Sequence, residues 1–269
     1  MLVHNLYFDL TRELNAEGSI AALASGQAVV YYRLAIMSKD GDWILQETPE
    51  ACGRALDVLA RHGARYRPGA PLDVRWLASG WSSHFEFFDP QGRRIRCDFV
   101  TRPPRVPPDE LAALFASPAE PTLVVPIEAL ILMKQTQRAK DYPVIGELAR
   151  RLPPEREIEL TTDPDRVLAL APLYGQGSRR RAVQAAHERR SRDAVVVELA
   201  READRMQTED RARLGRFHAA SQPYLREFQA AGVSVMHLPE AHQRVVELAE
   251  CTLPFDPFAR GGPEHGAAQ

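Results

Sequence analysis

Residues 23–45 have the sequence LASGQAVVYYRLAIMSKDGDWIL, and the end of this stretch decides the fold because two local structures compete there. Asp40-Gly41 lies between apolar runs, and Asp-Gly at such a place is typical of the tip of a β-hairpin. If Gly41 instead leads into a strand, Asp40 and Asp42 project from the same face, because strand side chains alternate. Two carboxylates on one face could bind a hard cation such as Mg²⁺. Both interpretations are open at this point.

A third carboxylate follows in the segment RIRCDFV. The turn residues at 89–92 predict a hairpin with strands near 84–88 and 93–100, and Asp98 is a charged residue at an otherwise apolar strand end. An aspartate at a strand end is most often solvated or caps a turn. A second metal ion at about 3.5–4 Å from the first would nevertheless need such a further carboxylate.

The composition indicates a soluble globular protein with room for two domains. The chain has 269 residues, is 45% apolar and 26% charged, and carries a net charge of −2, which gives no general attraction to nucleic acid or membranes. Its three separated cysteines form neither a zinc pattern nor a disulfide framework. The chain start lacks the pattern of a signal peptide, and no apolar run approaches the roughly 18 residues of a membrane span. These features predict a cytoplasmic protein.

The order of the elements predicts an α+β fold. Hydrophobic periodicity predicts helices before residue 152 at 3–15, 27–33, 49–62, 108–116 and 126–151, the last one interrupted at Pro143. Together with the hairpin, these helices indicate a mixed sheet flanked by helices.

Beyond residue 164 the strand signals nearly vanish. The predicted helices there are 164–171, 178–206, 208–231 and 239–251. The sequence therefore predicts an N-terminal mixed-sheet domain at 1–153 and a mainly helical domain at 154–258. A disordered tail is expected at 259–269.

The order and spacing of the polar motifs resemble the opening of the polymerase-β-like nucleotidyltransferase superfamily. Ser25-Gly26 matches the small-residue pair at the start of a helix, Asp40 and Asp42 match the Asp-x-Asp pair on a strand, and Asp98 matches the third carboxylate. Two positions depart from the pattern. Ser25 stands where the first glycine is usual, and Gly41 stands where the residue between the aspartates is usually apolar.

A second segment, VPIEALILMKQTQRAKDYPVIGEL at 125–148, resembles the closing helix of the compact bacterial nucleotidyltransferases of abortive-infection and toxin–antitoxin systems. Lys134, Arg138 and Lys140-Asp141 fill its basic and acidic positions. Lys134 and Arg138 are four residues apart, so they share a helix face, and two cations there need solvent or an anion such as a triphosphate. A solvated basic helix end is the alternative.

The resemblance implies a Mg²⁺-dependent nucleotidyltransferase that moves a nucleoside monophosphate from a nucleoside triphosphate to an RNA, protein or small-molecule acceptor. In that scheme Asp40 and Asp42 ligate two ions, while Asp98 holds the ion nearer the nucleophile and helps to take its proton.

The resemblance also assigns phosphate contacts. Backbone N–H groups at Ser25 and Gly26 would contact phosphate, Lys134 would neutralise the β- and γ-phosphates, and Arg138 and Lys140 would add further contacts.

Two other functions are compatible with the sequence. Ser25 and Gly41 favour a catalytically silent nucleotidyltransferase-like module that binds a nucleotide or a partner protein. A helical interaction protein with an α/β cap would explain the C-terminal half.

The expected partners are a nucleoside triphosphate, an RNA or protein acceptor and a cognate antitoxin, with neither membrane nor DNA. The arginine-rich segment 178–192 could contact RNA phosphates or form a solvated helix face.

Overall fold

The computed structural model describes residues 5–116, 122–189 and 191–259, and it confirms the α+β class. The described strands form a mixed sheet in the order β1-β2-β5-β4-β3. Their bounds are β1 Ala21–Ala24, β2 Gly41–Leu45, β3 Arg65–Arg67, β4 Ser83–Phe88 and β5 Arg94–Val100. Strand β2 pairs in parallel with β5, whereas β1 with β2, β4 with β5 and β3 with β4 pair antiparallel.

The hairpin interpretation of Asp40-Gly41 is wrong. Gly41 is the first residue of β2, and helix α2 (Ser25–Tyr31) connects β1 to this strand in place of a tight turn. The apolar run at 43–45 is buried on both sides of the sheet, since Trp43 and Ile44 belong to different core clusters. Burying these residues stabilises the strand more than a turn at Gly41 would.

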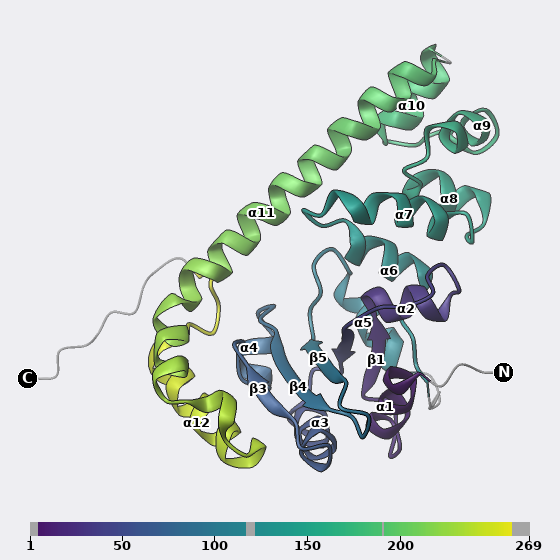
Figure 1. Ribbon diagram of the computed structural model, residues 1–269. Helices are drawn as coiled ribbons and strands as arrows, with labels where there is room; N and C mark the ends of the chain where they lie inside the picture. The colour runs from purple at the N-terminus through teal and green to yellow at the C-terminus, as the bar shows by residue number, and fades with distance from the viewer. Residues whose placement is uncertain (1–4, 117–121, 190, 260–269) are drawn as a thin grey trace, which may run out of the picture.

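One face of the sheet is fully covered by helices. The main core joins strand residues on this face with five helices (Figure 1). These helices are α1 (Leu6–Leu14), α3 (Pro49–Arg61), α4 (Val74–Leu77), α12 (Leu238–Thr252) and the C-terminal part of α11 (Arg192–Ala230). The rings of Trp43 and Phe99 stack in this core with centroids 5.3 Å apart. Cys97 is buried in the same cluster.

On the other face of the sheet, apolar packing among the described residues is concentrated over β1 and β2. There Ala22, Ala24 and Ile44 pack against α2, α6 (Ile127–Lys134) and α7 (Tyr142–Ala149). Helix α5 (Pro108–Ala116) adds Leu111 and Leu114 to this cluster. Strands β5, β4 and β3 therefore carry polar side chains on this face.

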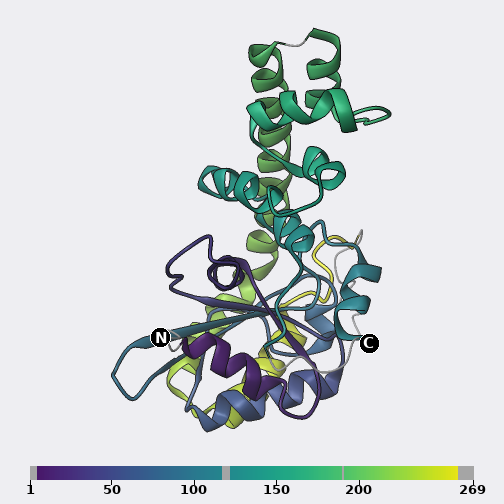
Figure 2. The same cartoon turned by 90° about the vertical axis from the view of Figure 1, so that its right-hand side faces the viewer.

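The C-terminal half forms a helical extension. Helices α8 (Pro154–Leu160), α9 (Pro164–Tyr174) and α10 (Arg181–Arg189) pack together with the start of α11 (Arg192–Ala230). Figures 1 and 2 show that α11 then runs from this group back to the sheet, where it meets α12. Tyr224 and Phe228, near its end, are buried in the main core. The predicted interruption between 206 and 208 is wrong, because α11 is one helix of 39 residues.

Several predicted boundaries shift. The predicted helix 126–151 breaks after Lys134 and resumes through the short 3-10 helix η1 (Ala139–Asp141), while Pro143 lies in the first turn of α7. Proline is tolerated there because the first N–H groups of a helix have no partner within the helix. A further 3-10 turn, η2 (Val233–Val235), joins α11 to α12. The sequence prediction missed the short elements β1, β3, α4 and α8.

The structure does not test two predictions about the domain organisation of the chain. The domain boundary near residue 153 stays a prediction. Of the predicted disordered tail at 259–269, residues 260–269 lie outside the described residues.

Among the helices that the structure describes, none has both the length and the apolar character needed to cross a membrane.

Candidate functional site

Four polar residues lie side by side across the open face of the sheet. Asp42 on β2 is the register partner of Asp98 on β5, Asp98 is the partner of His84 on β4, and His84 is the partner of Arg67 on β3. Register partners in adjacent strands project from the same face. The strand pairing therefore places two carboxylates next to each other, with an imidazole and a guanidinium beyond them.

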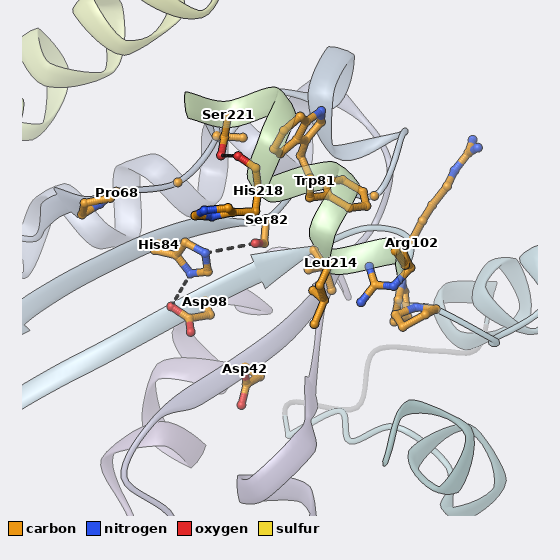
Figure 3. Close-up of a pocket in the computed structure, with 18 of the residues that line it drawn as sticks. Asp42, Pro68, Trp81, Ser82, His84, Asp98, Arg102, Leu214, His218 and Ser221 are labelled. Carbon is orange, nitrogen blue, oxygen red and sulfur yellow. Dashed lines mark hydrogen bonds and ion pairs between the residues drawn. The ribbon is translucent and has the colours of Figure 1, made fainter. Parts of the chain in front are cut away.

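A cavity of about 650 Å³ lies over this row of residues. The sheet supplies Asp42, Asp98 and His84 to its lining, and the C-terminal part of α11 supplies residues such as Leu214 and His218 (Figure 3). This volume is within the range of about 300–1,000 Å³ typical of small-molecule sites. The cavity therefore joins the sheet with the helix that returns from the C-terminal half.

Asp42 has the most strongly perturbed carboxyl of this row. Its burial raises its pKa to about 6, and the nearby charge of Asp98, with a smaller effect of Asp40, acts in the same direction. A hydrogen bond from the Ser25 side chain opposes this rise in pKa. A cation between the carboxylates would remove the repulsion, so Asp42 and Asp98 fit a hard divalent ion.

Asp98 is held by two basic side chains. Nη1 of Arg67 donates to Oδ1 of Asp98 at 3.3 Å, and Nδ1 of His84 lies 2.8 Å from the same oxygen. The His84 contact is close but is not a hydrogen bond in the described structure, and it becomes an ion pair when the ring is protonated. The two contacts fix the orientation of the Asp98 carboxylate.

Asp40 lies apart from this pair. It precedes β2, its Oδ1 is 3.6 Å from Nη1 of Arg96, and it lines a different hollow together with Lys39 and Arg94. Within the described residues, no three His, Cys, Asp or Glu side chains form a group that could hold a metal ion. The structure thus brings Asp42 and Asp98 together and directs Asp40 toward Arg96, while the predicted metal roles of all three stay predictions.

Ser25 and Gly26 occupy constrained positions at the start of α2. Ser25 has φ +48°, a left-handed conformation that costs a non-glycine residue energy, and its side chain reaches Asp42. A Cβ atom on Gly26 would lie 2.2 Å from Oγ of Ser38, so a larger residue there would require the Ser38 side chain to move. Ser25 lines the cavity and acts on Asp42 through its hydroxyl. The predicted phosphate contact of this pair stays a prediction.

Packing also explains why position 41 is a glycine. A Cβ atom at this position would lie 2.4 Å from the Trp43 ring and 2.5 Å from the Tyr7 ring. The Tyr7 hydroxyl also donates to the backbone oxygen of Lys39 at 2.7 Å, which holds the chain just before β2. The aromatic rings therefore occupy the place of the apolar side chain that is usual at this position.

The three predicted basic residues have different environments. Lys134 is buried at the end of α6, with Nζ 3.7 Å from Oδ1 of Asp141, and its burial, with the nearby Arg138, lowers its pKa. Arg138 lines the cavity, and its Nε lies 3.2 Å from Oδ2 of Asp141. Both cations are close enough to act electrostatically on Asp42. Lys140 is exposed and is not among the residues that line the cavity.

Sequence reasoning missed His84, Ser82, Arg67 and the contribution of α11. A signal for His84 was present, because the turn at 89–92 sets the register of the predicted hairpin and pairs His84 with Asp98. No comparable signal existed for Arg67, since β3 has three residues, or for α11, which is distant in sequence.

Comparisons with known proteins do not establish the function of this chain. No family model matches the chain, and no curated protein matches its sequence. The crystal structure of JHP933 from Helicobacter pylori is similar with a TM-score of 0.39 and 13% identity, over 81% of this chain and 97% of that chain. A candidate nucleotidyltransferase from H. pylori is similar with a TM-score of 0.39 and 13% identity, over 77% of this chain and 94% of that chain. Likenesses this distant carry no argument about function.

Proposed function

We propose that this protein is a Mg²⁺-dependent nucleotidyltransferase that moves a nucleoside monophosphate from a nucleoside triphosphate to a hydroxyl acceptor. The observation that carries the proposal is the pairing of Asp42 with Asp98 on parallel neighbouring strands at the floor of a cavity of about 650 Å³. Two adjacent carboxylates and a cavity of nucleotide size are what metal-assisted transfer of a nucleotidyl group needs.

Within the carboxylate pair, Asp42 suits Mg²⁺ better than a carboxylate that already has a cationic partner would. Mg²⁺ is commonly held by one or two carboxylates together with water and substrate phosphates. Asp42 has a raised pKa. The charge of Arg138 lowers this pKa, but the two side chains form no ion pair in the described structure. When bound, the ion would neutralise charge on the phosphates and polarise the α-phosphorus.

The residues around the pair supply binding and orientation. Ser25 positions the Asp42 carboxylate through its hydroxyl, and Arg138 is the cavity-lining cation proposed to contact phosphate. Lys134 contacts Asp141 and contributes a buried positive charge near the cavity. Asp40 would join the metal site only if its contact with Arg96 were released.

The acceptor would enter under α11, whose residues line the cavity opposite the carboxylates. We propose a hydroxyl of an RNA, a protein or a small molecule, as the resemblance implies. A role in a toxin–antitoxin pair, with Lys140 and the segment 178–192 available for other contacts, stays a prediction of that resemblance.

One observation favours the silent-module alternative. Oδ1 of Asp98 is occupied by Arg67 and His84, and Asp40 is paired with Arg96. A site whose carboxylates already have protein cations could bind a nucleotide through the cavity without transferring it. The two functions differ in product formation, not in nucleotide binding.

The test follows label from a nucleoside triphosphate labelled at the α-phosphate. The protein is incubated with Mg²⁺ and a cell extract that offers RNA, proteins and metabolites, and transfer is compared between wild type and Asp98→Asn. We expect transfer by the wild type and a loss of at least about 100-fold in the variant. Asp57→Asn, an exposed carboxylate on α3, is the matched control and should transfer normally. Wild-type binding without any transfer would instead support the silent module.

A further inference from the structure

A serine hydroxyl, an imidazole and a carboxylate lie in line on the floor of the cavity. Oγ of Ser82 is 3.0 Å from Nε2 of His84, and Nδ1 of the same ring is 2.8 Å from Oδ1 of Asp98. Figure 3 shows His84 between the other two side chains, with Asp42 on the neighbouring strand. Ser82 directly precedes β4 and His84 is the second residue of that strand, and both side chains line the cavity.

The imidazole is fixed on several sides. Gly69 packs against its edge so closely that a Cβ atom there would lie 2.4 Å from Cδ2 of His84. The backbone oxygen of Ser82 accepts a hydrogen bond from the N–H of Ala70 at 2.9 Å. This bond fixes the backbone of Ser82 just before β4. The geometry of the three groups is therefore set by backbone packing as well as by their own contacts.

This arrangement activates a hydroxyl. Nε2 of His84 lies within hydrogen-bond distance of the Ser82 hydroxyl, so it is the nitrogen placed to take the Ser82 proton. A serine is a weak nucleophile until a neighbouring base can take its proton. Of the cavity-lining serines, Ser221 instead donates its hydroxyl to the backbone oxygen of His218 at 3.0 Å.

We propose that Ser82 is a self-modification site, at which the protein accepts a nucleotidyl group from a nucleoside triphosphate bound in its own cavity. In this step the bond from Oγ of Ser82 to the α-phosphorus forms, the bond from that phosphorus to the bridging oxygen breaks, and pyrophosphate leaves. The hydroxyl proton passes to Nε2 of His84. The inference rests on the proposed nucleotidyl transfer, and it names a residue of this chain as an acceptor.

The test measures the intact mass of the full-length protein after incubation with Mg²⁺ and each of the four ribonucleoside triphosphates. We expect an increase by one nucleotidyl group, assigned to Ser82 by fragmentation of the peptide that contains it. Ser82→Ala should lose the adduct completely. His84→Gln should slow its formation by about 100-fold or more, the scale of a lost general base. Ser221→Ala, the matched control in the same cavity, should form the adduct at the wild-type rate.

The possible failures are distinguishable. If the protein transfers labelled nucleotide to an acceptor in the extract while Ser82 stays unmodified, the self-modification is overturned and the proposed function stands. If an adduct forms at another residue or persists in Ser82→Ala, the assignment to Ser82 is overturned. If the triphosphate binds and label reaches neither Ser82 nor any other acceptor, both the inference and the proposed transferase activity are overturned.

Discussion

Asp42 and Asp98 are register partners on β2 and β5, which form the one parallel pair among the described strands of the sheet. Parallel pairing aligns both strands in the same direction, so two residues that are distant in sequence meet with their side chains on the same face. Burial, together with repulsion from Asp98, raises the pKa of Asp42. A cation bound between the two carboxylates would neutralise this repulsion.

The first prediction concerns the stability cost of Asp42. Its pKa rises from 3.8 to about 6 on folding, so between these pH values the folded state holds a proton that the unfolded state has released. The free energy of unfolding therefore falls as pH rises through this window. Asp42→Asn removes the effect and should raise the free energy of unfolding by about 1–2 kcal/mol at neutral pH.

Urea unfolding of both proteins at about pH 4 and about pH 7.5 measures this difference. The gain from Asp42→Asn should be small at the lower pH and full at the higher one. Asp57→Asn, on the exposed side of α3, should change stability little at either pH. A gain of equal size at both pH values would mean that ionisation of Asp42 is not its cause.

A second prediction separates the roles of Lys134 and Arg138. The side chain of Lys134 is only 9% exposed and contacts Asp141, whereas that of Arg138 is 53% exposed and lines the cavity. Lys134→Met should lower the free energy of unfolding by about 1–3 kcal/mol, because it leaves a buried carboxylate with fewer partners. Arg138→Met should leave stability within about 0.5 kcal/mol and weaken nucleotide binding. Thermal unfolding and nucleotide titration of the two variants measure these effects, and the opposite assignment would contradict the proposed roles.

A third prediction tests the packing explanation of Gly41. Gly41→Ala would place a Cβ atom within 2.7 Å of ring atoms of Trp43 and Tyr7, so it should destabilise the fold by about 1–3 kcal/mol. Gly53→Ala is the matched control. Gly53 lies inside α3 with no atom within 4 Å of the added Cβ, and this change should stabilise by about 0.5–1 kcal/mol. Equal tolerance of both substitutions in unfolding experiments would refute the close contact at Gly41.

The fold class and the strands that carry Asp42 and Asp98 could be predicted from the sequence because they depend on local patterns, whereas the grouping of the carboxylates was implied by the family resemblance. The alternation around Asp98 and the turn at 89–92 specify the β4–β5 hairpin, and the apolar run after Asp42 specifies β2. The same patterns predicted that Asp40 and Asp42 lie on one face of the strand. Strand alternation does not reveal that Asp40 contacts Arg96 instead.

The remaining parts of the site depend on contacts between segments that are distant in sequence. The roof of the cavity comes from α11, which a local pattern split near residue 207, because its central turns are largely exposed and carry few apolar residues. Arg67 comes from a three-residue strand whose position is fixed by pairing with β4. Neither the length of α11 nor the place of β3 is determined by the residues within it.

The central claim is that Asp42 and Asp98 form a Mg²⁺-dependent nucleotide site, and calorimetric titration with a nucleoside triphosphate tests it most directly. We predict binding by the wild type that requires Mg²⁺ and that Asp42→Asn weakens by about 1.5–3 kcal/mol, or roughly 10–100-fold. Asp57→Asn should bind as the wild type does. Binding of equal strength with and without Mg²⁺, or unchanged binding by Asp42→Asn, would contradict the account.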